Sequence, residues 1–95
     1  MLEDYLTRET PLPFAVELIE GSKIKTVGDI ENYLRNLNNS RHLKSHWGVA
    51  VRMFANAMQE PAYLKAATLS FQTALALDGL LMRMHQSAAI LRDDP

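Results

Sequence analysis

The chain has 95 residues, no cysteine and a formal net charge of −1 at pH 7. The lack of cysteine excludes disulfides, thiolate nucleophiles and cysteine-ligated metal sites. The near-zero charge gives no global attraction to nucleic acid or to an acidic membrane surface. An apolar fraction of 47% is ordinary for a globular protein and too high for a disordered one. We expect one small domain over residues 14–85, preceded by a loosely ordered arm (1–13) and followed by a frayed tail (86–95).

The first residues contain early acids and no long apolar run, so we expect no secretory signal. The apolar stretches are a few residues long, far short of a membrane span. These features and the lack of cysteine are compatible with a cytoplasmic location, which we take as the expectation.

Residues 14–27 predict a β-hairpin, because apolar and more polar residues alternate along both arms. A three-residue loop at 20–22 would pair Leu18 with Ile24 on one face and Glu17 with Lys25 on the other. The alternative is a short helix over residues 13–20, with proline at its start and glycine after its end. The alternation favours strands. The apolar residues in question are Phe14, Val16, Leu18 and Ile24.

A first helix is predicted to begin after Thr26, which can cap it, with Asp29 in the first turn. Its apolar stripe runs to about Asn38, where asparagine and serine residues end the pattern. The residues of the stripe are Ile30, Tyr33, Leu34 and Leu37.

Two alanine-rich helices follow, the second beginning at Ser40 or Ser45 and the third at Glu60 or Pro61. Both repeat apolar residues at helical spacing, and their alanines would let two antiparallel helices approach closely. The predicted stripes are Leu43, Trp47, Ala50, Val51, Phe54, Ala57 and Met58, then Tyr63, Leu64, Ala67, Phe71, Ala74 and Leu75.

The third helix is predicted to stop at Asp78-Gly79, after which two interpretations are open. Residues 80–84 could form a third short strand beside the hairpin, or the helical stripe could continue to Leu91. The predicted fold class is α+β: an N-terminal β-hairpin, with or without a third short C-terminal strand, packed on three helices.

This order of parts resembles a family of small proteins, common in rhizobia and their relatives, known as domain of unknown function 982. The likeness covers residues 14–84 and favours the third strand over a continued helix. In the family pattern an arginine stands where this chain has Thr68, and a tryptophan-proline pair stands near Leu37-Asn38. The family has no assigned activity, so the resemblance implies a fold and no reaction. The segments that carry it are Phe14-Ala15-Val16, Thr26-Val27 before Ile30 and Leu34, Ala50 with Phe54, Ala57 and Met58, Ala67-Thr68-Leu69-Ser70-Phe71, Ala74-Leu75, and Asp78-Gly79-Leu80-Leu81.

One basic cluster near the start of the second helix is a candidate anion-binding site, where free backbone N–H groups would assist. Positive charge at this position opposes the helix dipole. Nucleic acid is disfavoured by the neutral overall charge and by the lack of an aromatic-basic motif. The cluster consists of Arg35, Arg41, His42, Lys44 and His46.

His42 and His46 stand four residues apart and could face one metal ion. No acid of the metalloprotease type lies between them, and the third histidine, His85, is distant. We therefore predict no metal site and no cofactor. The sequence contains no phosphate loop, nucleophile elbow or acid pair at meaningful spacing, so we predict no catalytic residues and no enzymatic activity.

The helical segments carry more apolar residues than one small core can cover, and methionine suits irregular interfaces. Two interpretations are open: a closed monomer, or an apolar patch that binds a second copy or another protein. The leading hypothesis is a non-enzymatic interaction module that could form a homodimer, and the alternative is an anion- or nucleic-acid-binding module. The candidate interface residues are Val49, Met53, Leu69 and Leu77.

Overall fold

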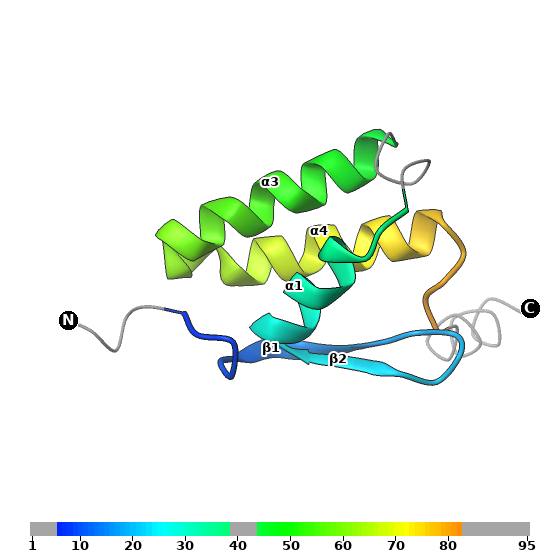
Figure 1. Cartoon of the computed structure of the whole chain (residues 1–95), viewed down its shortest axis with the longest axis horizontal. Coiled ribbons are helices and arrows are strands. Elements are labelled where there is room, and N and C mark those ends of the chain that lie inside the picture. Colours follow the sequence, from blue (N-terminus) through cyan, green and yellow to red (C-terminus); the bar gives the residue numbers. More distant parts are fainter. Residues whose placement is uncertain (1–5, 39–43, 83–95) are drawn as a thin grey trace, which may run out of the picture.

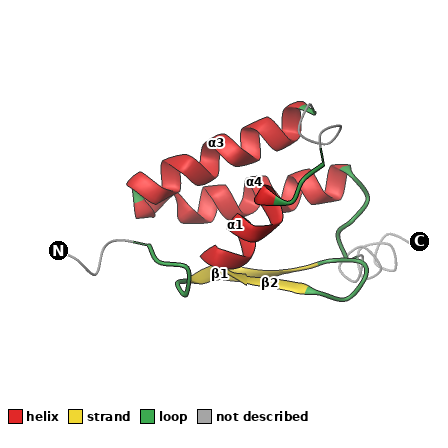
Figure 2. Cartoon of the chain, in the orientation of Figure 1, coloured by secondary structure: helices red, strands yellow, loops and turns green. Residues whose placement is uncertain are grey.

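The computed structural model describes residues 6–38 and 44–82, which form an antiparallel hairpin followed by helices (Figure 1). Figure 2 shows the strands as one layer and the helices packed on it, with α4 between the hairpin and α3. The predicted α+β class is confirmed. The elements are β1 (Pro11–Glu17), β2 (Lys23–Thr26), α1 (Val27–Arg35), α3 (Ser45–Gln59), the 3-10 helix η2 (Pro61–Tyr63) and α4 (Leu64–Leu77).

The hairpin forms where the sequence predicts it, but its register was predicted incorrectly. Val16 lies opposite Ile24, and Glu17 lies opposite Lys23 instead of Lys25. The reason is a five-residue loop, in which the Leu18 N–H donates to Ser22 O at 2.9 Å and Gly21 takes a φ of +110°. Because the shift is two residues, the apolar side chains stay on the predicted face.

The strand β1 begins at Pro11, three residues before the predicted domain boundary. The segment that precedes β1 in sequence lies against the start of α1. The Gly28 N–H donates to Arg8 O and the Val27 N–H donates to Thr10 O, both at 2.9 Å. A Cβ at Gly28 would lie 3.0 Å from Arg8 O, so glycine permits this approach. The predicted arm, residues 1–13, thus includes strand residues, and its first five residues lie outside the described part.

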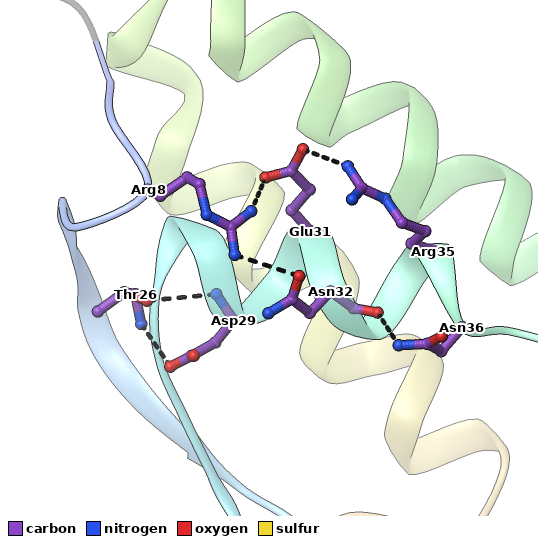
Figure 3. A network of polar contacts seen from close by, with 7 residues as sticks. All are labelled: Arg8, Thr26, Asp29, Glu31, Asn32, Arg35 and Asn36. Atoms are coloured by element: carbon purple, nitrogen blue, oxygen red, sulfur yellow. Dashed lines mark hydrogen bonds and ion pairs between the residues drawn. The ribbon is translucent and has the colours of Figure 1, made fainter.

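The start of α1 is a capping box, which confirms Thr26 as the predicted cap. Thr26 Oγ1 accepts a hydrogen bond from the Asp29 N–H at 3.2 Å. Asp29 Oδ2 accepts in return from the Thr26 N–H at 3.1 Å (Figure 3). The same oxygen accepts from the Lys25 N–H at 2.9 Å. Three backbone N–H groups at the start of the helix are thereby satisfied.

The core joins the three long helices through an aromatic cluster. Tyr33 of α1 stacks on Trp47 of α3 with ring centroids 5.8 Å apart, and both rings meet Phe71 of α4 edge-on at 5.4 and 6.0 Å. Such arrangements suit the quadrupoles of aromatic rings. The α3–α4 seam is made of fully buried alanines, which confirms the predicted close approach: Ala50, Ala57, Ala67 and Ala74.

Part of the predicted helical stripes is wrong. Val51, Met58 and Tyr63 were predicted to face the core and are 37, 41 and 50% exposed. Helical periodicity identifies an apolar side, whereas the neighbouring elements decide how much of that side is covered. Here α3 packs mainly on α4, and the short α1 does not reach these positions.

The end of α4 confirms the predicted stop. Gly79 has a φ of +75°, the Leu80 N–H donates to Leu75 O, and the Gly79 N–H donates to Ala76 O, which together form a Schellman motif. The chain then pairs with the free edge of β1 through a single bridge between Leu18 and Leu81. Residues 80–82 are therefore extended and pair with the hairpin, and the helix does not continue through them. Residues from 83 onward lie outside the described part.

The two phenylalanines of the helix pair should differ in their contribution to stability. Phe71 is 1% exposed, so Phe71→Ala should lower the free energy of unfolding by about 3–5 kcal/mol. Phe54 is only partly buried, and Phe54→Ala should cost clearly less. Denaturant unfolding measures both values; equal losses would show that the two rings are equally buried.

The capping box makes stability depend on pH. The hydrogen bond from the Lys25 N–H, assisted by Thr26, lowers the pKa of Asp29 below its ordinary value of 3.8. A lowered pKa in the folded state gives stability that is full above the unfolded pKa and is lost as pH falls through the folded pKa. Asp29→Asn should therefore destabilise the protein at pH 7, with a difference that shrinks below about pH 4. Urea titrations across this range measure it; a constant difference would contradict the prediction.

Candidate functional site

Two of the three described residues of the predicted basic cluster, Lys44 and His46, contact Asp78, an acid that the sequence analysis did not assign to it. Asp78 lies at the C-terminal end of α4, and its side chain is only 6% exposed. Its Oδ1 accepts from Lys44 Nζ at 3.2 Å and lies 2.8 Å from His46 Nε2, while its Oδ2 accepts from Trp47 Nε1 at 2.8 Å. Because an ionised carboxylate only accepts, His46 carries its hydrogen on Nε2.

Asp78 supplies the negative charge that the start of α3 lacks. The first turn of α3 contains no acid, and Lys44 at the N-cap makes no capping hydrogen bond with its side chain. A carboxylate is favourable at a helix N-terminus and unfavourable at a C-terminus, where Asp78 itself stands. The unfavourable charges at the two helix ends therefore compensate each other: Lys44 is paired with Asp78, and the His46 ring contacts the same carboxylate.

The contact between Asp78 and the start of α3 could have been predicted from the sequence, but only by considering how the two helices pack together. Cations at the start of one helix and an acid at the end of the next are each locally unfavourable. In an antiparallel pair these two ends lie side by side, so the two misplaced charges indicate a contact.

The cations predicted to bind an anion have carboxylate partners where the structure describes them. Lys44 and His46 contact Asp78. Arg35 donates to Glu31 at 2.8 Å, and Glu31 also pairs with Arg8 (Figure 3). Arg41 and His42 lie outside the described residues. The anion site thus stays a prediction, and a ligand there would have to compete with Asp78 and Glu31.

Within residues 6–38 and 44–82, no group of three His, Asp or Glu side chains could hold a metal ion. His42, one member of the histidine pair, falls outside these ranges. In the same part of the chain, no helix is both long enough and apolar enough to cross a membrane.

Three of the four predicted interface residues are exposed. Val49, Leu69 and Leu77 are 44, 46 and 64% exposed, whereas Met53 is partly buried and packs against the core. An open hollow of about 260 Å³ lies between α3 and α4, lined by His46, Val49, Leu69, Ser70 and Thr73. Leu77 follows Thr73 by one helical turn, on the same side of α4. We name these six residues the α3–α4 face.

Comparison of the chain with protein-family models, curated proteins and solved structures finds no match. The resemblance to domain of unknown function 982 therefore stays a prediction. At the position where that pattern has arginine, Thr68 is fully buried and donates to Leu64 O at 2.8 Å. A guanidinium at this point would be a buried charge, which is unfavourable without a partner.

Removing the Asp78 carboxylate should loosen the start of α3. Asp78→Ala leaves the Trp47 N–H and His46 without this acceptor and should cost roughly 2–4 kcal/mol of unfolding free energy. Asp78→Asn keeps an acceptor and the shape, so its loss should be smaller. Trp47 is the single tryptophan, and its fluorescence reports the change directly.

Lys44→Met is the matched control, because Lys44 is 49% exposed and its ion pair is screened by water. It should cost less than about 1 kcal/mol. A loss for Asp78→Ala no larger than for Lys44→Met would show that the carboxylate does not stabilise this junction.

Proposed function

We propose that this protein is a small non-enzymatic interaction module and that the α3–α4 face is its binding surface. The observation that carries the proposal is the exposure of Val49 and Leu69 at the wall of a hollow between α3 and α4, with exposed Leu77 one helical turn after Thr73. Single exposed apolar residues are common, but apolar residues gathered around a recess are typical of interaction surfaces.

The chemistry of the hollow supports binding over catalysis. A carboxylate-bound imidazole beside hydroxyl groups, as in Asp78, His46 and Ser70, has the composition of a hydrolase triad. Acyl transfer also needs backbone N–H groups aimed at the developing oxyanion. Ser70 and Thr73 lie inside α4, where backbone N–H groups are used by the helix itself. The N–H groups of Ser70 and Thr73 are therefore not available to stabilise an oxyanion, and the hollow suits the binding of side chains better than acyl transfer.

The anion-binding alternative would use Arg35, Arg41, His42, Lys44 and His46. Its described basic side chains already have carboxylate partners. A phosphate would have to compete with Glu31 and Asp78 for them, so we expect it to bind weakly. We place the protein in the cytoplasm as part of the proposal, because a cysteine-free chain is compatible with that compartment.

A second copy of the chain is the first occupant to test. With a net charge of only −1, copies repel each other weakly, and we expect the mass in solution to rise with protein concentration. Val49→Glu should hold the protein monomeric by placing a charge in the contact. Sedimentation equilibrium over a wide concentration range measures the effect.

Val51→Glu is the matched control. It makes the same substitution two residues further along α3, where Val51 is 37% exposed on the other side of the helix. Association that survives Val51→Glu and is lost in Val49→Glu would support the α3–α4 face. Equal effects of both variants, or a strict monomer at high concentration, would contradict self-association through this face.

A further inference from the structure

We propose that the α3–α4 face binds an amphipathic segment of another protein in which apolar side chains are flanked by Asp or Glu. This inference rests on the proposed function and names the chemistry of the partner. It follows from the distribution of charge around the hollow, the size of the hollow and the position of its walls.

The helix pair is free of acids. Neither α3 (Ser45–Gln59) nor α4 (Leu64–Leu77) contains Asp or Glu. Each contains one exposed cation, Arg52 and Lys65, and within the described residues neither makes an ion pair. The overall charge of −1 conceals this asymmetry.

The described acids lie elsewhere. Glu60 is in the connection between the helices, and Asp78 at the end of α4 is paired with Lys44 and His46. A partner approaching the α3–α4 face therefore meets Arg52 and Lys65, whose charges make no ion pair within the described residues. The remaining described acids are on the segment before β1, the hairpin and α1: Glu9, Glu17, Glu20, Asp29 and Glu31.

The two cations flank the apolar walls of the hollow. Arg52 is three residues after Val49, and Lys65 is four residues before Leu69, so each cation neighbours the apolar residue of its own helix. Because α3 and α4 are different walls, the apolar centre has one cation on each side. A helix with an apolar stripe between two rows of carboxylates would match this arrangement.

The volume of the hollow suits the side chains of a docked segment better than a small-molecule ligand. Its volume of about 260 Å³ is below the range of about 300–1,000 Å³ that small-molecule pockets usually have. It is open to solvent, so it would take one or two apolar side chains of a docked segment. The hydroxyls of Ser70 and Thr73 could accept or donate a hydrogen bond at its wall.

Two other occupants fit less well. A second copy meeting face to face would bring the same acid-free surface, so Arg52 and Lys65 would find no opposite charge. An anionic membrane favours protruding apolar groups and clusters of about four to eight cations, whereas this face has a recess and two cations. Weak self-association remains compatible with an acidic partner that competes for the same face.

The test uses two synthetic helical peptides of equal length, each with a leucine stripe, one flanked by glutamate and the other by lysine. Binding to the full chain is measured by isothermal titration calorimetry at low and high salt. The glutamate peptide should bind about tenfold more tightly than the lysine peptide at low salt, and salt should reduce the difference. It should also dissociate any self-associated species.

Charge-reversal variants assign the effect to the two cations. The double variant Arg52→Glu, Lys65→Glu should invert the preference between the peptides. The double variant Lys23→Glu, Lys25→Glu changes the net charge equally, on the hairpin, and should leave the preference unchanged. Circular dichroism melting curves establish that both variants are folded.

The outcomes separate the inference from the proposed function. If both peptides bind equally and Val49→Glu abolishes binding, the acidic partner is wrong and the interaction face stands. If neither peptide binds and Val49→Glu leaves the solution mass unchanged, both fail. Binding to phosphatidylglycerol vesicles without binding to the glutamate peptide would assign the face to a membrane surface and overturn the inference.

Discussion

The carboxylate of Asp78 is the contact on which the arrangement of the helices depends. It joins the end of α4 to the first turn of α3 through Lys44, His46 and Trp47. By accepting from the Trp47 N–H, it satisfies the polar end of the largest buried side chain. The indole ring so held stacks on Tyr33 and meets Phe71, which brings α1 to the same point. Asp78 thus holds the polar edge of the Trp47 ring, and the aromatic contacts of that ring join α1, α3 and α4.

The geometry of this junction also explains why an apolar face remains outside. Buried alanines form the seam between α3 and α4, and the larger side chains of Val49 and Leu69 are exposed outside it. On one side α1 and the hairpin cover the helix pair, but the two-stranded sheet and one short helix are too small to cover both sides. Val49, Leu69 and Leu77 are exposed for this reason, and the first two line the hollow between the helices.

The features that could be predicted from the sequence are the local ones. The Thr26 cap with Asp29 in the first turn and the glycine-ended stop of α4 depend on a few neighbouring residues, and the alanine seam depends on helical spacing. The hairpin register was missed because backbone hydrogen bonds in the loop, from Leu18 to Ser22, decided it. Val51 and Met58 were misplaced because their burial depends on which neighbours reach them. The role of Asp78 was missed because its partners lie more than thirty residues away in sequence.

The same distinction applies to charge. The formal charge of the whole chain argues against strong electrostatic binding, and that argument holds for a uniform surface. Here the fold separates the signs: most described acids lie on the hairpin, the segment before it and α1, whereas α3 and α4 contain no acid. Screening limits interactions between exposed charges to about 10 Å at 0.1 M salt. A docked segment therefore responds to Arg52 and Lys65 beside it more than to the carboxylates of the hairpin, and the charge of a local face, not of the chain, decides which partner chemistry fits.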